Sequence, residues 1–120
     1  MQRNLEFFRD LQLRGQPVDA SPKILRQVDS ARVAMRTTLK AQGFKLLACA
    51  RMLKISEGHL SKIVNEKEPM PEWFPLAFCY ATGSNLLRQY LALQEALHET
   101  TERHDWLERK LANELRQVAA

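Results

Sequence analysis

A run of polar residues near the middle of the chain carries side chains that can bind the base edges of DNA. Lys62 can donate to guanine O6 and N7, Glu57 can accept from cytosine N4, and His59 can contact a base or a phosphate. Ser61 suits either partner, whereas Gly58 has no side chain and only allows close approach. These residue types favour recognition of nucleic acid over the making and breaking of bonds.

Motifs typical of enzymes and metal sites do not occur in the sequence. There is no Gly-rich phosphate loop, no HExxH and no GxSxG, and the acidic residues are scattered. Cys49 and Cys79 lie far apart without CxxC spacing or clustered His partners, so we expect buried, reduced thiols. His98 and His104 fall on different faces of a helix. We therefore expect no enzyme activity, no cofactor and no metal.

Positive charge is concentrated in the segment that contains the polar run. The whole chain has a net charge of +4. Residues 22–68 contain ten Lys and Arg and four acidic residues, so this segment carries +6 and the remainder −2. A local excess of cations is what a phosphate-binding surface requires.

The polar run belongs to the second of two short helices, predicted at 44–53 and 56–65 and joined by Lys54 and Ile55. Ser56 can cap the second helix and leave its amino end available to a phosphate or a base edge. Two helices can cross over so short a turn only if their closest residues are small or apolar. The residues that we expect to pack this helix-turn-helix are Leu47, Ala50, Leu53, Ile55, Leu60 and Ile63.

A longer helix is predicted before this pair, at residues 22–42. Ser21 can cap it, Pro22 suits its first turn, and Gly43 can end it. Its apolar residues recur at steps of three and four, so one stripe should face a core. That stripe consists of Ile24, Val28, Ala31, Met35 and Leu39.

Another helix is predicted after the pair, at residues 72–82. Pro69 and Pro71 block helix continuation before it, Pro75 fits only its first turn, and Gly83 can end it. From Asn85 onward the sequence is compatible with helix. Because no alternating strand pattern occurs, the predicted fold class is all-α.

The run LLACARMLKISEGHLSKIVN at residues 46–65 resembles the helix-turn-helix of lambda repressor and Cro-type DNA-binding regulators. The resemblance extends over roughly residues 21–91, since that family also has a preceding amphipathic helix ending in Gly and a following core helix. It implies a compact bundle of about five helices, here followed by a long C-terminal helix. It also implies double-stranded DNA as partner and a role as a transcriptional repressor of phage or prophage type.

Four residues match structural positions of that family's motif. Ser56 matches the helix-starting Ser, Ala50 the small residue of the first helix, Ile55 the apolar turn residue and Leu60 the buried aliphatic residue. The resemblance implies base contacts from Ser56, Glu57, Gly58, His59, Ser61 and Lys62, and DNA backbone contacts from Lys45, Lys54, Asn65 and Lys67.

The sequence departs from the family at two positions. Lys54 stands where Gly is usual, and a positive φ there would cost about 1 kcal/mol against Gly. Leu46 stands where a Gln usually bonds to the DNA backbone, so that hydrogen bond is lost.

Residues 1–20 form a predicted N-terminal appendage, and they contain the apolar residues Leu5, Phe7, Phe8, Leu11 and Leu13 before the turn at Gly15. Two adjacent Phe side chains are costly to expose. We expect this segment to form a short helix that packs on the body or contacts a protein partner through Phe7 and Phe8.

The C-terminal segment, residues 92–120, continues a heptad pattern that begins at Leu86 and has polar members at Thr100, His104 and Glu114. Three outcomes are open: a coiled coil, a helix broken near Thr100, or packing of residues 86–97 on the bundle. A coiled coil would make the protein a homodimer, with an interface of Tyr90, Leu93, Leu97, His104, Leu107, Leu111 and Val118.

Together these patterns predict a sequence-specific double-stranded DNA-binding transcriptional regulator. The alternative is a helical protein-protein interaction module or antitoxin-like adaptor that binds through Phe7 and Phe8 or through the tail. No apolar run approaches the roughly 20 residues that span a bilayer, and residues 1–15 are charged where a signal peptide is apolar. We therefore expect a cytoplasmic protein without membrane contact.

Overall fold

The structure, a computed structural model, describes residues 5–119, and within that range the chain forms seven helices and no β-strand. The all-α fold class is thereby confirmed. The number of helices exceeds the predicted five or so because the N-terminal helix packs on the bundle and one predicted helix is split in two. The helices are α1 (Leu5–Gln12), α2 (Pro22–Gln27), α3 (Ala31–Gln42), α4 (Leu46–Leu53), α5 (Glu57–Val64), α6 (Phe74–Thr82) and α7 (Leu86–Ala119).

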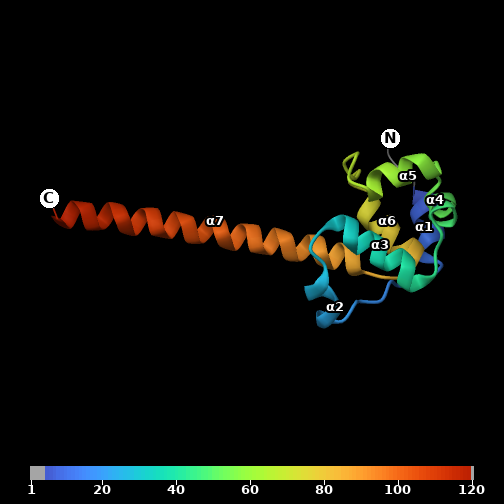
Figure 1. Ribbon diagram of the computed structural model, residues 1–120, viewed down its shortest axis with the longest axis horizontal. Coiled ribbons are helices and arrows are strands. Elements are labelled where there is room, and N and C mark those ends of the chain that lie inside the picture. Colours follow the sequence, from blue (N-terminus) through green and yellow to red (C-terminus); the bar gives the residue numbers. More distant parts are fainter. Residues whose placement is uncertain (1–4, 120) are drawn as a thin grey trace.

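The molecule has the shape of a body with a rod. Helices α1 to α6 gather into one body, and α7 starts in it and projects far beyond it (Figure 1). The overall dimensions of 66 × 33 × 27 Å reflect this projection. None of the helices between residues 5 and 119 combines the length and apolarity needed to cross a membrane.

The prediction of a single helix at residues 22–42 is wrong. Helix α2 ends at Val28, and Ser30 begins α3. The Ser30 side chain accepts a hydrogen bond from the Val33 amide at 3.1 Å and so caps α3. Val28 takes an extended conformation and buries its side chain in the core. Ile24, expected on the buried stripe, is 43% exposed as a result.

Helix ends elsewhere follow the local signals. Ser21 caps α2 through the Ile24 amide. Gly43 ends α3 in the left-handed region with φ of 72°, a conformation that glycine adopts without steric cost. Pro75 lies in the first turn of α6, where its missing N–H leaves no hydrogen bond unmade. These predictions are confirmed.

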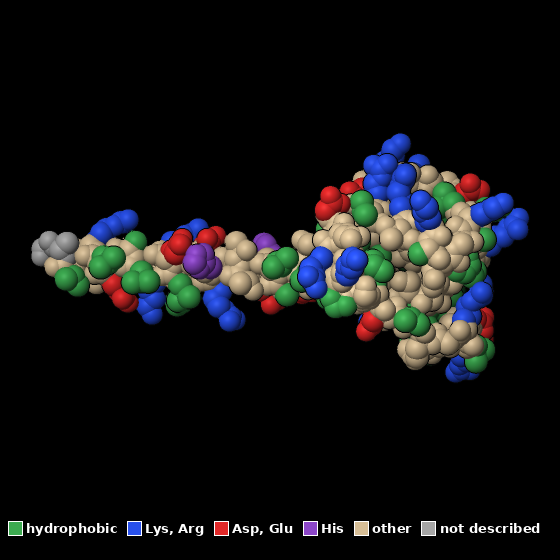
Figure 2. All heavy atoms as spheres, turned by 60° about the horizontal axis from the view of Figure 1, so that its bottom comes forward, with side chains coloured by type: hydrophobic (Ala, Val, Ile, Leu, Met, Phe, Trp, Pro, Cys, Tyr) green, Lys and Arg blue, Asp and Glu red, His purple; other side chains and the backbone are tan. Residues whose placement is uncertain are grey.

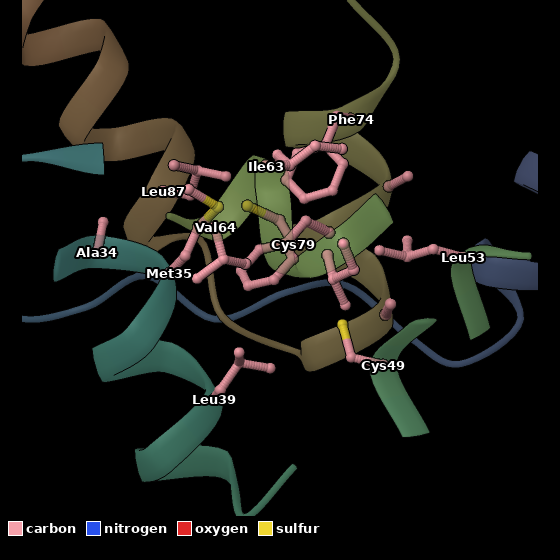
Figure 3. Packing of buried hydrophobic residues seen from close by; sticks show 14 of the residues in the cluster. Ala34, Met35, Leu39, Cys49, Leu53, Ile63, Val64, Phe74, Cys79 and Leu87 are labelled. Atoms are coloured by element: carbon pink, nitrogen blue, oxygen red, sulfur yellow. The ribbon is translucent and has the colours of Figure 1, made fainter. Parts of the chain in front are cut away.

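The core lies where α3, α4, α5, α6 and the first turns of α7 meet. Phe74 and Phe78 of α6 stack with their ring centroids 5.4 Å apart and are fully buried. Apolar side chains from the surrounding helices close around them (Figure 3). Fully buried members include Met35, Leu53, Leu60, Ile63 and Leu87.

The N-terminal helix α1 packs on the body, which is one of the two outcomes expected for it. Phe7 and Leu11 of α1 are each 4% exposed. The Phe7 ring meets the Trp73 ring edge to face at 6.0 Å, and Phe8 is half-buried beside it. The Phe7 side chain is thus enclosed by the body, whereas Phe8 stays partly exposed.

The chain between α1 and α2 is also fixed, because it pairs with the junction of α6 and α7. The Val18 amide donates to the Gly83 carbonyl, and the Asn85 amide donates to the Val18 carbonyl, both at 2.9 Å. The Gln89 side chain accepts from the Ala20 amide at 2.8 Å. These bonds anchor the start of α7 to the body.

Helix α7 divides into a buried start and a long exposed remainder. Leu86, Leu87 and Tyr90 are buried, whereas every side chain from Ala92 to Val118 is exposed. Tyr90 donates its hydroxyl to the Asp29 carbonyl at 3.1 Å, so its assignment to a dimer interface is wrong. The expected packing of residues 86–97 on the bundle is therefore correct only for the first part of that range, and it stops before Leu93.

The possible break near Thr100 is absent, since α7 is continuous through it. The hydroxyl groups of Thr100 and Thr101 donate to the carbonyls of Ala96 and Leu97, both at 2.9 Å. Each threonine therefore bonds its polar group within the helix instead of ending it.

Cys49 and Cys79 are buried and free, as predicted. Burial raises the pKa of Cys49 to about 12 and that of Cys79 to about 11. At pH 8 these values reduce the reactive thiolate by about a thousandfold and a hundredfold relative to an ordinary thiol.

Both thiols should therefore react with Ellman's reagent far more slowly in the native protein than in urea. The rate of absorbance increase under the two conditions measures this. Equal rates would show that the two cysteines are not held in the core.

Candidate nucleic-acid interface

Helices α4 and α5 are joined by a tight turn formed by Lys54, Ile55 and Ser56. Lys54 adopts a left-handed conformation with φ of 56°, and its amide donates to the Ala50 and Arg51 carbonyls at the end of α4. The Ile55 amide donates to the Ala50 carbonyl at 3.1 Å. The predicted positive φ at Lys54 is confirmed, so this position uses a conformation that usually favours glycine.

Ser56 begins α5 as a capping residue. Its backbone is extended, and its hydroxyl oxygen accepts a hydrogen bond from the His59 amide at 3.1 Å. Such a cap typically contributes about 1 kcal/mol to stability. The cap predicted at Ser56 is confirmed, and it occupies the side chain that was also a candidate base contact.

The two faces of α5 differ completely in environment. Leu60, Ile63 and Val64 point into the body and are 0%, 1% and 3% exposed. Glu57, Gly58 and Lys62 are exposed, and His59 and Ser61 are half-buried at the margins. The candidate base-contact positions therefore lie on or beside the outer face.

Helix α4 supports α5 from the side, with one difference from the prediction. Ala50 and Leu53 are buried where the helices pack, as expected. Leu47 was expected beside them but is 43% exposed, and Leu46 is half-buried in its place. The buried face of α4 is therefore centred on Cys49, Ala50 and Leu53, and Leu47 lies outside it.

Two candidate residues at the end of α5 bind each other. The Asn65 side-chain amide donates to the Ser61 carbonyl at 2.9 Å and to the Ser61 hydroxyl at 3.2 Å. Arg36 of α3 donates to the Asn65 side-chain oxygen. This chain of contacts ties the end of α5 to α3. Arg36 was not predicted to belong to the site, because it lies far from Asn65 along the chain.

Glu68 contacts two candidate base-binding residues from the segment after α5. Its carboxylate lies 3.4 Å from His59 Nε2 and 3.7 Å from Lys62 Nζ. The amides of Lys67 and Glu68 both donate to the Lys62 carbonyl, so the chain turns back over the end of the helix. Only this reversal brings the acid to the outer face, which is why sequence reasoning missed it.

The remaining candidates surround α5 and are exposed. Lys45 precedes α4 and makes no side-chain capping bond, Lys54 lies in the turn, and Lys67 follows α5. Within residues 5–119 no three His, Cys, Asp or Glu side chains gather closely enough to hold a metal ion. The chemistry of this face is therefore that of cations and hydrogen-bonding groups.

Comparison with known proteins adds no assignment. A scan against protein-family models, a search of curated proteins and a search of solved structures found no match to this chain.

Gly58 gives a test of the outer face. A Cβ built on this residue meets no atom within 4 Å, so packing does not require glycine here. The substitution Gly58→Ala should raise the free energy of unfolding by up to about 1 kcal/mol, because alanine favours a helix over glycine, and Gly58 lies in the first turn of α5. Urea denaturation followed by circular dichroism measures this, and a lower stability would mean that the outer face of α5 is covered within the protein.

Proposed function

We propose that this protein is a sequence-specific DNA-binding transcriptional regulator, a repressor, that inserts α5 into the major groove of double-stranded DNA. The observation that carries the proposal is the outer face of α5. One side of the helix is anchored by Leu60, Ile63 and Val64, while its capped amino end and the polar residues Glu57 and Lys62 face outward. A major groove admits such a helix, and α4 with its short turn would hold it as a helix-turn-helix.

The charge of the surrounding surface supports this proposal. The +6 segment at residues 22–68 includes all of α2 to α5. Lys and Arg side chains project from several places on the body (Figure 2). Exposed cations around α5 can bind phosphates on both sides of a groove, with Lys45 and Lys54 near α4 and Lys67 after α5.

Roles within the proposed interface follow from the contacts of each side chain. Lys62 and Glu57 keep exposed polar groups that can bond to bases. Three other candidates, Ser56, Ser61 and Asn65, already make hydrogen bonds within the chain. Their main role is to stabilise the two ends of α5. His59 can reach DNA after leaving Glu68.

A second candidate function is a protein-protein interaction module. The observation in its favour is the row of exposed apolar residues along α7, which a partner helix could cover. This candidate does not account for the polar outer face of α5.

Selection from random duplexes at two salt concentrations tests the proposed function. Base readout should enrich one motif at both concentrations, whereas attraction to phosphates alone weakens steeply with salt and enriches nothing. Absence of any enriched motif would favour the protein-partner candidate.

The variant Lys62→Glu should lower affinity for the selected duplex at least tenfold, the usual cost of losing one base contact. Its matched control is Arg109→Glu, which reverses one charge on exposed α7 far from α5. Fluorescence anisotropy with a labelled duplex measures both, and equal affinities for the two variants would remove α5 from the interface.

The variant Glu68→Gln should bind the duplex about twofold to fivefold more tightly, the equivalent of one exposed ion pair. The reason is that its carboxylate occupies His59 and Lys62 and would repel phosphates. Glu99→Gln on α7 removes the same charge elsewhere and should change affinity little. Weaker binding by Glu68→Gln would instead make Glu68 a base contact.

A further inference from the structure

The exposed part of α7 presents an apolar stripe that polar Thr100 and His104 interrupt. Six aliphatic side chains lie on it at steps of three or four, apart from the step of ten residues from Leu97 to Leu107, and their exposed fractions range from 37% to 84%. Figure 2 shows hydrophobic side chains along the rod among charged ones. The stripe residues are Leu93, Leu97, Leu107, Leu111, Leu115 and Val118.

No residue between positions 5 and 119 covers this stripe. Residues 92–118 extend over roughly 40 Å at 1.5 Å per residue and are exposed throughout. A helix of this length in a protein normally gains its stability by packing an amphipathic face. The contacts His98–Glu102 and His104–Glu108, both at 3.0 Å, join residues of the same helix and cover no aliphatic residue of the stripe.

The residue types of the stripe fit the seam of a two-stranded coiled coil. In a heptad labelled a to g, Leu97, Leu111 and Val118 occupy a positions, and Leu93 and Leu107 occupy d positions. His104 at a and both Thr100 and Glu114 at d are polar, and polar residues in a seam fix the register at some cost in stability. A second, parallel copy of the chain aligned in register would place each seam residue opposite the same residue of its partner.

The charged residues beside the seam select the orientation of that second copy. Arg103 and Lys110 occupy g positions, and Glu108 occupies an e position. In a parallel pair each g residue faces the e residue five places further along the partner, so Arg103 meets Glu108 twice. In an antiparallel pair g faces g, and the basic residues would repel each other.

We propose that α7 binds a second copy of this chain as a parallel, in-register coiled coil that begins at Leu93. Tyr90 and the residues before it stay in the body of each protomer. This proposal is independent of DNA binding, since it concerns a different surface and is tested without DNA. If a different protein bound the stripe instead, the proposal of a second copy would be wrong.

Sedimentation equilibrium of the full chain tests the proposal. The mass should approach twice 13.9 kDa with rising concentration. The double variant Leu107→Gln, Leu111→Gln should raise the dissociation constant at least a hundredfold. The matched control Ala112→Gln, Asn113→Gln alters adjacent outward positions with the same helix-forming residue and should leave the constant unchanged. A chain that stays monomeric up to millimolar concentration overturns the proposal.

Orientation is tested separately by the variant Val118→Cys. In a parallel pair the two introduced thiols meet at the a position and should oxidise to a disulfide-linked dimer. Cys49 and Cys79 are buried and do not compete. A dimer that forms no cross-link under oxidation would have antiparallel helices.

The charge exchange Arg103→Glu with Glu108→Arg is a second test of orientation. It should restore a dimer that Arg103→Glu alone weakens, and failure to restore the dimer would also exclude the parallel arrangement.

Discussion

Burial of the inner face of α5 is the constraint on which the rest of the body depends. Leu60, Ile63 and Val64 must leave water, and they do so where α5 packs on α3 and α4, in the same buried cluster as the stacked rings of Phe74 and Phe78. Because a helix cannot bury one stripe without turning the opposite one outward, this packing alone directs Glu57 and Lys62 to solvent. The polar outer face is thus fixed by apolar contacts made elsewhere.

Local signals in the sequence predicted those parts of the fold that a few neighbouring residues decide. Ser21, Ser56, Gly43 and Pro75 each act within one helical turn, and each lies where expected. The prediction failed where local signals compete. Residues 22–42 have an unbroken helical pattern, yet α2 ends at Val28, which is extended and buried, and the Ser30 side chain caps a new helix.

The candidate site shows the same division between local and distant contacts. The positions of Gly58 and Lys62 on α5 follow from helical spacing. The contacts that alter their surroundings do not, since Arg36 reaches Asn65 from α3 and Glu68 returns over α5 by a chain reversal. Tyr90 was misplaced for a similar reason. Its heptad position suits a seam, but the Asp29 carbonyl accepts its hydroxyl and holds the ring in the body.

The continuity of α7 would link the two proposed surfaces. One helix runs without a break from the core, where Leu86 and Leu87 are fixed, to the end of the apolar stripe. A parallel pair of such helices has its twofold axis along the rod, so the two bodies would stand at one end, related by that axis. A palindromic duplex has a twofold axis perpendicular to its length. Coincidence of the two axes would direct the rod away from the DNA and present two copies of α5 to equivalent half-sites. Because the helix is anchored rather than hinged at Leu87, the spacing of those half-sites would be set by the packing of α7 against the body and not by a flexible linker.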